Sequence, residues 1–284
     1  MNKFMQDFIE KFEKKVKETI EKYKLATKED KILVACSGGK DSTTVLYLLK
    51  KFGYNVEALH INLLMGSWSK ENERNIRKFC KEHGIKLYVF SIRDELGYSI
   101  CYIKSVVQQK AKLKQCTICG IIRRWLINKK ARALKASKVA TGHNLDDEAQ
   151  TVIMNLIKGN PWLGINQGPV TGTIEEKKFV TRIKPLFFCK EKDIRKYSEL
   201  MKFPVLYRRC PCVVSALRHE VRKKLDELEK KNKNIKENIV SNWLEIKKLL
   251  IQKQEQKPIL YCKNCGEPSR REICKACSIL KKIS

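Results

Sequence analysis

Apolar side chains recur in this chain with two different spacings, which predict two kinds of element. Near the start, five apolar residues stand at every fourth position: Phe4, Phe8, Phe12, Val16 and Ile20. Lys and Glu fill most of the positions between them. This spacing predicts an amphipathic helix over about residues 3–24, with one face packed on the protein and the charged face in solvent.

Further along, short apolar runs alternate with segments of helical character. The runs predict strands at residues 31–36, 56–62, 86–90 and 138–142. The segments between them predict helices at residues 43–50, 70–82 and 120–136. Alternating strands and helices predict an α/β fold with a parallel sheet covered on both faces. Ligands of such sheets bind beyond the carboxyl ends of the strands, so we expect the site in the loops that follow them.

The strand pattern stops after Pro204, where the composition changes. Residues 213–252 are rich in charge and predict helix, and a polar linker follows them. We therefore divide the chain into four parts: an N-terminal amphipathic helix (1–29), an α/β catalytic domain (30–212), a helical segment with its linker (213–257) and a small C-terminal module (258–284).

Charge points to a polyanionic partner. The 284 residues include 60 Lys and Arg against 31 Asp and Glu, a formal net charge of +29 spread along the whole chain. Such a field favours nucleic acid, because neutralising phosphates releases counterions, although a basic surface can also serve solubility alone. The chain begins without an apolar leader, and no stretch approaches the ~20 apolar residues of a membrane span. We expect a cytoplasmic protein without a membrane partner.

A glycine-rich segment, Ser37-Gly38-Gly39-Lys40-Asp41-Ser42, lies where the first predicted strand gives way to a helix. Two glycines allow backbone N–H groups to face an anion at the helix N-terminus, and Ser37, Ser42 and Lys40 add donors. The segment lacks the Walker A pattern, which serves chemistry at a γ-phosphate. We therefore predict a phosphate-binding loop that supports another cleavage.

A second polar segment, Thr141-Gly-His-Asn-Leu-Asp-Asp-Glu-Ala149, follows the strand at 138–142 and opens a helix. Asp146, Asp147 and Glu148 fall in the first helical turn, where carboxylates already complement the helix dipole. His60 ends the second predicted strand, where a capping role is equally compatible with its position.

Cysteines form a further pattern. Six of the twelve stand in C-x-x-C pairs, and the chain has no secretory leader to favour disulfides. Four of them, Cys262, Cys265, Cys274 and Cys277, have the spacing C-x2-C-x8-C-x2-C, which predicts a structural Zn²⁺ site. The remaining pair, Cys116 and Cys119, begins a predicted helix, where thiolates are favoured.

The segment from Ser37 to Ser42 resembles the phosphate loop of the PP-loop pyrophosphatases, and the Gly142–Ala149 segment resembles the second motif of those that act on tRNA. The resemblance implies that ATP is split between its α- and β-phosphates. It implies that the loop, His60 and Gly142 contact the nucleotide, and that Asp41 and Asp147 act catalytically near Mg²⁺-bound phosphates.

Together with the loop, Cys116-Thr-Ile-Cys119-Gly followed by Arg123 and Arg124 resembles the TtcA/TtuA group of tRNA 2-thiolation enzymes. These enzymes hold a [4Fe-4S] cluster with three cysteines, and Cys210 in Cys210-Pro-Cys212 is expected to supply the third. Three ligands leave one iron open for sulfur. From the residues alone, zinc binding or a persulfide at Cys116 and Cys119 remain alternatives, as does a contribution from Cys212.

Two departures from the TtuA-type relatives are visible. These relatives carry lysine where Arg123 stands, and because arginine cannot act as a base at neutral pH, we assign Arg123 to charge stabilisation. They also begin with a zinc module, whereas no cysteine precedes Cys36 here.

The resemblance implies a tRNA sulfurtransferase that adenylates the C2 oxygen of a pyrimidine and replaces it by sulfur, with uridine favoured over cytidine. ATP, Mg²⁺, a [4Fe-4S] cluster and Zn²⁺ are the implied cofactors. The implied partners are tRNA and a sulfur donor, which is sulfide or a thiocarboxylated ubiquitin-like protein, and a homodimer is one possible assembly. The alternatives are a PP-loop tRNA ligase without a cluster and a non-catalytic tRNA-binding zinc protein.

Overall fold

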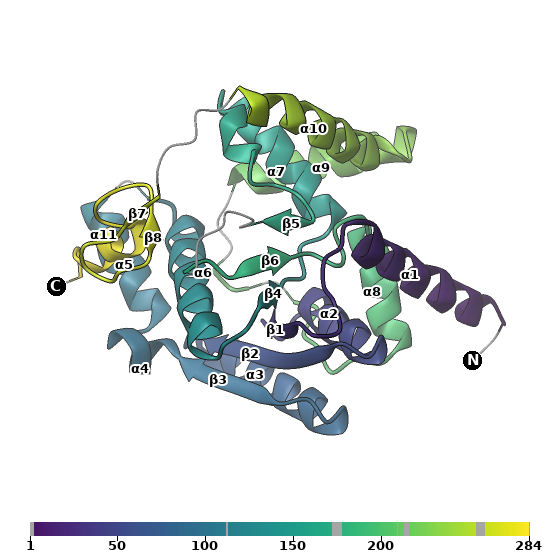
Figure 1. Cartoon of the computed structure of the whole chain (residues 1–284), viewed down its shortest axis with the longest axis horizontal. Helices are drawn as coiled ribbons and strands as arrows, with labels where there is room; N and C mark the ends of the chain where they lie inside the picture. The colour runs from purple at the N-terminus through teal and green to yellow at the C-terminus, as the bar shows by residue number, and fades with distance from the viewer. Residues whose placement is uncertain are drawn as a thin grey trace.

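The computed structural model describes residues 3–111, 113–171, 178–208, 210–212, 216–253 and 259–283. A six-stranded sheet in the order β3-β2-β1-β4-β6-β5 forms its centre (Figure 1). The strands are β1 (Lys31–Ala35), β2 (Asn55–Asn62), β3 (Leu87–Ser91), β4 (Lys138–Ala140), β5 (Val170–Thr171) and β6 (Thr181–Ile183). All neighbours pair in parallel except β5, which runs antiparallel to β6 at the edge. The α/β class and the mostly parallel sheet are thus confirmed.

Helices cover both faces of this sheet. They are α1 (Lys3–Lys22), α2 (Lys40–Lys51), α3 (Gly66–Glu82), α4 (Ile92–Leu96), α5 (Ile100–Lys110), α6 (Gln115–Ala133), α7 (Leu145–Ile157), the 3-10 helix η1 (Pro161–Gly164), α8 (Glu191–Leu200), α9 (Ala216–Lys231) and α10 (Ile235–Gln252). On β1, Ile32 and Val34 are buried beneath the group formed by α1, α2, α3 and α8, whereas Leu33 faces α6. Burial on both faces explains why β1 is a continuous apolar run.

The amphipathic helix α1 forms, but its buried stripe differs from the predicted one. Ile9, Phe12, Val16 and Ile20 are buried, and Phe12 stacks on Tyr197 of α8 with ring centroids 4.6 Å apart. Phe4, which the every-fourth pattern includes, is 71% exposed. An α-helix has 3.6 residues per turn, so residues spaced by four rotate gradually around the helix and away from its inward face. The buried stripe therefore begins at Ile9 and leaves Phe4 outside.

The segment predicted as helix over residues 213–252 is two helices in the described residues, separated at residues 232–234. Both α9 and α10 pack on α7, through a small apolar group that includes Leu145, Val221 and Val240. The expectation that strands stop after Pro204 is wrong, because β7 (Leu260–Tyr261) and β8 (Pro268–Ser269) pair in the terminal module. Such two-residue strands carry too little pattern to be predicted.

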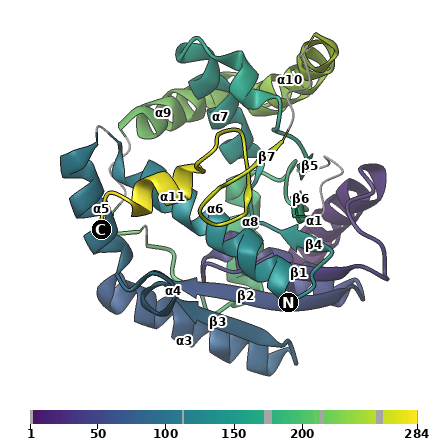
Figure 2. The same ribbon diagram turned by 60° about the vertical axis from the view of Figure 1, so that its left-hand side comes forward.

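The terminal module, which ends in α11 (Lys275–Leu280), lies against α6 in both views of the ribbon (Figures 1 and 2). Its Ile279 shares an apolar core with Ile118 and Ile122 of α6. Glu267 accepts hydrogen bonds from Asn128 at 2.9 Å and forms an ion pair with Arg132. None of the described helices is long and apolar enough to cross a membrane.

Candidate active site

The site lies where the strand order reverses. Strand β1 is flanked by β2 on one side and β4 on the other, so the chain leaves β1 and β4 in different directions and opens a crevice at their carboxyl ends. A cleft of about 420 Å³ occupies this place. Its lining includes residues of the loops after β1 and β4, the end of β2 and the middle of α6.

Backbone geometry makes Gly38 necessary in the first loop. Its φ of +82° is in the left-handed region, and a Cβ there would lie 2.6 Å from Oδ1 of Asn72. Ser42 holds the loop closed, because its Oγ accepts the N–H of Ser37 at 3.2 Å and donates to the carbonyl of Gly39 at 3.1 Å. Helix α2 then begins at Lys40, so its free N–H groups face the end of the loop. This is the anion-binding geometry that the sequence predicted.

The second loop packs directly on the first. A Cβ on Gly142 would lie 2.8 Å from the backbone of Asp41 and Ser42, so only glycine permits the approach. Asn144 joins the two loops, since its Nδ2 donates to Asp41 at 3.1 Å and its Oδ1 accepts the N–H of Asp147 at 3.1 Å. Sequence reasoning missed Asn144, although asparagine before a helix with three acidic residues in its first turn is a typical N-cap signal.

The adjacent aspartates of α7 have different environments. Asp146 is buried, accepts the N–H of Glu191 at 2.7 Å and pairs with Nζ of Lys236 at 2.5 Å. Asp147 lines the cleft, with its Oδ1 3.4 Å from Nη1 of Arg218. The pKa of Asp147 is raised to about 7, because the carboxyl group is shielded from bulk water and because the negative charge of Asp41 lies nearby. The second aspartate, not the first, therefore faces the cleft.

Two histidines also line the cleft. His60 is buried, and its Nδ1 donates to the carbonyl of Cys36 at 2.9 Å. That tautomer leaves Nε2 as an acceptor, and it is a buried atom without a partner among the described residues, so a ligand N–H or O–H would satisfy it. His143 is open to the cleft, with Nδ1 2.9 Å from Oγ1 of Thr141. Shielding from bulk water and the neighbouring cations lower its pKa to about 3.

Cations gather on one wall of the cleft: Arg123, Arg124, Arg182 and Lys184. Burial lowers the pKa of Arg182 to about 10, with repulsion from Arg124 adding to it. Lys184 is paired with Glu148 at 2.6 Å. Such a wall favours an anionic ligand. Arg182 and Lys184 were not predicted as site residues from the sequence, because the three-residue strand β6 is too short to be recognised there.

The cysteines expected to hold a cluster meet beside this wall. Cys116 and Cys119 lie in the first turns of α6, and Cys119 is one helical turn before Arg123. Cys210 follows α8 and contacts Sδ of Met65 at 3.8 Å. Burial raises the pKa of Cys119, and the nearby thiols of Cys210 and Cys116 add to this rise. The three thiols are therefore close enough to interact electrostatically.

Three further groups adjoin this triad: Cys212, which the sequence left open as an additional ligand, and Cys101 and Lys104, which it did not single out. The Sγ of Cys116 lies 3.8 Å from the carbonyl of Cys212. Cys212 and Cys101 line a shared depression with the buried Lys104. Burial opposes the charge of Lys104, yet hydrogen bonding to Cys212 and the fields of Cys101 and Cys119 raise its pKa. A buried ammonium beside several thiols favours their thiolate forms.

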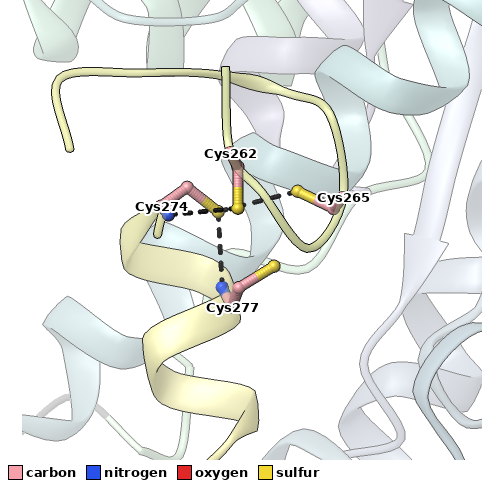
Figure 3. A group of neighbouring side chains, drawn as sticks. All are labelled: Cys262, Cys265, Cys274 and Cys277. Atoms are coloured by element: carbon pink, nitrogen blue, oxygen red, sulfur yellow. Dashed lines mark hydrogen bonds between the residues drawn. The ribbon is translucent and has the colours of Figure 1, made fainter. Parts of the chain in front are cut away.

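The terminal cysteines form a compact group of four candidate metal ligands (Figure 3). The four sulfurs lie within 4.8 Å of one another, and Cys265 and Cys274 are 3.8 Å apart. A tetrahedron with Zn–S bonds of ~2.3 Å has S–S edges of ~3.8 Å, so the group fits one zinc ion. Cys262 accepts the N–H of Cys274 at 3.2 Å. Although burial acts against it, this and other backbone hydrogen bonds hold the pKa of Cys262 at about 6.

The loop, cleft and sheet define an ATP-binding protein of the PP-loop class, and a PP-loop domain family model matches residues 8–205. The chain is 38% identical over 272 residues to tRNA-5-methyluridine(54) 2-sulfurtransferase of Pyrococcus horikoshii, covering 96% of this chain and 85% of that relative. It is 33% identical over 278 residues to the enzyme of the same name from Thermotoga maritima, covering 98% and 90%.

Among solved structures, the fold matches U34-tRNA thiolase NcsA from Methanococcus maripaludis with its [4Fe-4S] cluster. The TM-score is 0.79 at 30% identity, covering 98% of this chain and 88% of that one. This chain therefore belongs to the tRNA 2-thiolation sulfurtransferases of the PP-loop family. The family inferred from the sequence motifs is confirmed.

Proposed function

We propose that this protein is an ATP-dependent tRNA sulfurtransferase that adenylates the C2 oxygen of a uridine and replaces that oxygen by sulfur. One observation carries the proposal: α6 joins the cysteine triad to the phosphate cleft. Cys119 lies one turn before Arg123, and Arg123 lines the same cleft as Ser37 and Asp41. An activated base and a sulfur held at the triad would therefore meet at one place.

In the proposed reaction, the N–H groups after Gly39 hold the phosphates of ATP, and Asp41 and Asp147 bind Mg²⁺. The C2 oxygen of the base attacks the α-phosphorus, and pyrophosphate leaves. Sulfur then displaces AMP from the base. Arg123 and Arg124 stabilise the negative charge that develops near the base. His60 orients the nucleotide through its free Nε2.

The triad suits a [4Fe-4S] cluster, because three thiols approach from two segments in a pocket that Met65 and Ile118 make apolar. When bound by three cysteines, the cluster supplies an open iron that can hold sulfur. The structural relative NcsA contains a [4Fe-4S] cluster. Binding requires thiolates, so protons must leave Cys119 and Cys210, whose pKa values burial raises. Zn²⁺ at the terminal group is the second proposed metal.

The position of the base, the sulfur donor and the assembly extend the proposal. The names of the relatives specify 5-methyluridine at position 54 in one case and uridine at position 34 in the other, which supports a uridine as the target. The donor is sulfide or a thiocarboxylated ubiquitin-like protein, and the enzyme works on tRNA in the cytoplasm, either alone or as a homodimer.

A pair of cysteine variants tests the proposal. Anaerobically reconstituted Cys210→Ser protein should lose the visible absorbance of the cluster and the 2-thiolated nucleoside in mass spectrometry. Cys212→Ser, the matched control two residues away, should keep both. Both variants should still form AMP from ATP if adenylation needs no cluster. Loss of colour only in Cys212→Ser would make Cys212 the third ligand, and thiolation by iron-free protein would favour a persulfide.

A further inference from the structure

One indole ring lines the cleft. Among the residues that the structure describes, Trp68 is the single aromatic side chain there apart from the two histidines. It lies in the first turn of α3 and is half-buried. Its buried part packs against the apolar group that includes Met65 and Ile118, and it borders the same space as Asp41 and Arg123. A flat apolar surface is therefore available to a ligand in the cleft.

The turn before α3 fixes the position of this ring. Leu64 has a φ of +56°, in the left-handed region that such a residue rarely adopts, and Oδ1 of Asn62 accepts its N–H at 2.9 Å. Four residues later, Nδ2 of Asn72 donates to the carbonyl of Trp68 at 2.8 Å. Asn72 also contacts the phosphate loop, where a Cβ on Gly38 would lie 2.6 Å from its Oδ1. Backbone strain of this kind persists only where the surrounding contacts hold it, so the location of Trp68 is strongly determined.

Trp68 lies between the phosphate loop and the cysteine triad. It lines a small hollow together with Ser37 and Lys40 of the loop. It also packs on the apolar group that contains Met65, whose Sδ is 3.8 Å from Sγ of Cys210. A base that is adenylated at the loop and receives sulfur at the triad has to occupy the space between them.

The proposed substrate explains why a ring is useful at this place. A base within an RNA loop stacks on its neighbours, and it must leave that stack to enter the cleft of an enzyme. Aromatic side chains offset this cost, because an unstacked base regains its stacking on their rings. The cations of the cleft wall, Arg123 and Arg124, attract phosphate but offer no comparable apolar surface.

We propose that Trp68 is the stacking platform for the target uracil, which lies on the indole ring with its C2 carbon between the phosphate loop and the triad. This inference rests on the proposed function. The ring binds and orients the base and takes no part in making or breaking bonds. Adenine of ATP is the other base that enters this cleft, and the experiments below separate the two.

Substitution of the ring should affect tRNA and spare ATP. Trp68→Leu keeps an apolar side chain but no aromatic ring, so kcat/KM for tRNA should fall by about tenfold while the KM for ATP stays unchanged. Trp68→Phe should retain most of the activity, because a ring remains. Nε1 of Trp68 has no hydrogen-bond partner among the described residues, so phenylalanine removes no hydrogen bond from the empty protein.

Trp125 provides the matched control. It packs against the same apolar group, and its Nε1 is likewise buried without a partner in the part of the chain that the structure describes. Unlike Trp68, it does not line the cleft. Trp125→Leu should therefore keep wild-type kinetics with tRNA, and a difference between the two leucine variants reports the cleft and not the packing.

Binding of abasic tRNA tests the contact without relying on turnover. The probes are intact tRNA and transcripts with an abasic residue at position 54 or at position 34, the positions in the names of the relatives. Trp68→Leu should weaken binding of intact tRNA by about tenfold, and this loss should disappear with one of the abasic transcripts. The transcript that removes the effect identifies the base that stacks on the ring.

An equal loss of affinity for intact tRNA and for both abasic transcripts would overturn the proposal, as would wild-type kinetics and binding in Trp68→Leu. A raised KM for ATP with unchanged tRNA binding would assign the ring to adenine and overturn it as well. A wild-type protein that forms no 2-thiolated nucleoside would refute the proposed function itself, so the two failures are distinguishable.

Discussion

Replacing Asp147 by Asn should stabilise the metal-free protein and at the same time abolish AMP formation. The carboxylate of Asp147 lies in a cleft that already contains Asp41, and the pKa of Asp147 is raised to about 7. The folded state therefore resists ionisation of this group. Asparagine has nearly the same shape and no charge, so it removes the unfavourable charge together with the proposed Mg²⁺ ligand.

The size of the effect follows from linkage. A rise in pKa from the ordinary value of 3.8 to about 7 on folding would lower the free energy of unfolding of the wild type by ~4 kcal/mol at most. The side chain is 38% exposed, however, and solvent screens its charge, so we expect ~1 to 2 kcal/mol. For a chain of this length that is a rise in Tm of ~2 to 6 °C.

The stability difference between Asp147→Asn and the wild type should grow as the pH rises. Below pH 3.8 the carboxyl group is neutral in both states, so wild type and Asp147→Asn are equally stable. As the pH rises towards about 7, the unfolded chain ionises while the folded one resists, and the wild type loses stability relative to the variant. Above that pH the difference is constant.

The neighbouring aspartate is the control for this experiment. Asp146 pairs with Lys236, whose side chain is 2% exposed, so Asp146→Asn leaves a buried ammonium with fewer carboxylates. This variant should lose ~1 to 3 kcal/mol of stability. The assay is thermal unfolding with EDTA from about pH 5 to pH 8, with AMP formation measured in parallel. Equal stability of Asp147→Asn and wild type at every pH would refute the raised pKa, and wild-type AMP formation would refute the catalytic assignment.

Three further predictions address the loops, the charge and the terminal module. Gly142→Ala should raise the KM for ATP strongly, because its Cβ would force the second loop away from Asp41, and unchanged ATP kinetics would argue against the close packing. Affinity for tRNA should fall by ~10³-fold or more between about 50 and 200 mM salt if ~6 to 10 phosphates are neutralised, whereas a flat dependence would exclude a phosphate interface. Cys262→Ser should release zinc, unfold residues 258–284 and weaken tRNA binding while the main domain still melts cooperatively; unchanged zinc content would argue against the site.

The sheet and the phosphate loops could be predicted from the sequence because their causes are local. A strand buried on both faces is a continuous apolar run, as in β1, and Gly38 and Gly142 stand where a side chain would collide. The cysteine spacing of the terminal module is equally local. Resemblance then added the roles of Asp41 and Asp147, which remain predictions until the variants are measured.

The other wall of the site could not be predicted, because its residues come from helices without a motif. Glu191, Arg222 and Lys236 lie in segments where Lys, Arg and Glu alternate as on any solvated helix. Only the packing of α8 on α2, and of α9 and α10 on α7, brings them to the phosphate loop and to Asp146. Long-range contacts of this kind leave no periodic trace in the sequence.

The distribution of charge also explains how one strongly basic chain can hold a site for both metal and phosphate. Carboxylates are the minority in the sequence, yet they concentrate at the phosphate loop, where Asp41, Asp147 and Glu191 lie close to Lys40 and to arginines. These pairs offset part of the positive charge at the loop, which lowers the repulsion between Lys40 and the nearby arginines. In the proposed reaction, these carboxylates would bind Mg²⁺ and the cations would bind the phosphates of ATP. The remaining excess of positive charge along the chain supports the proposed interface with a polyanion as large as tRNA.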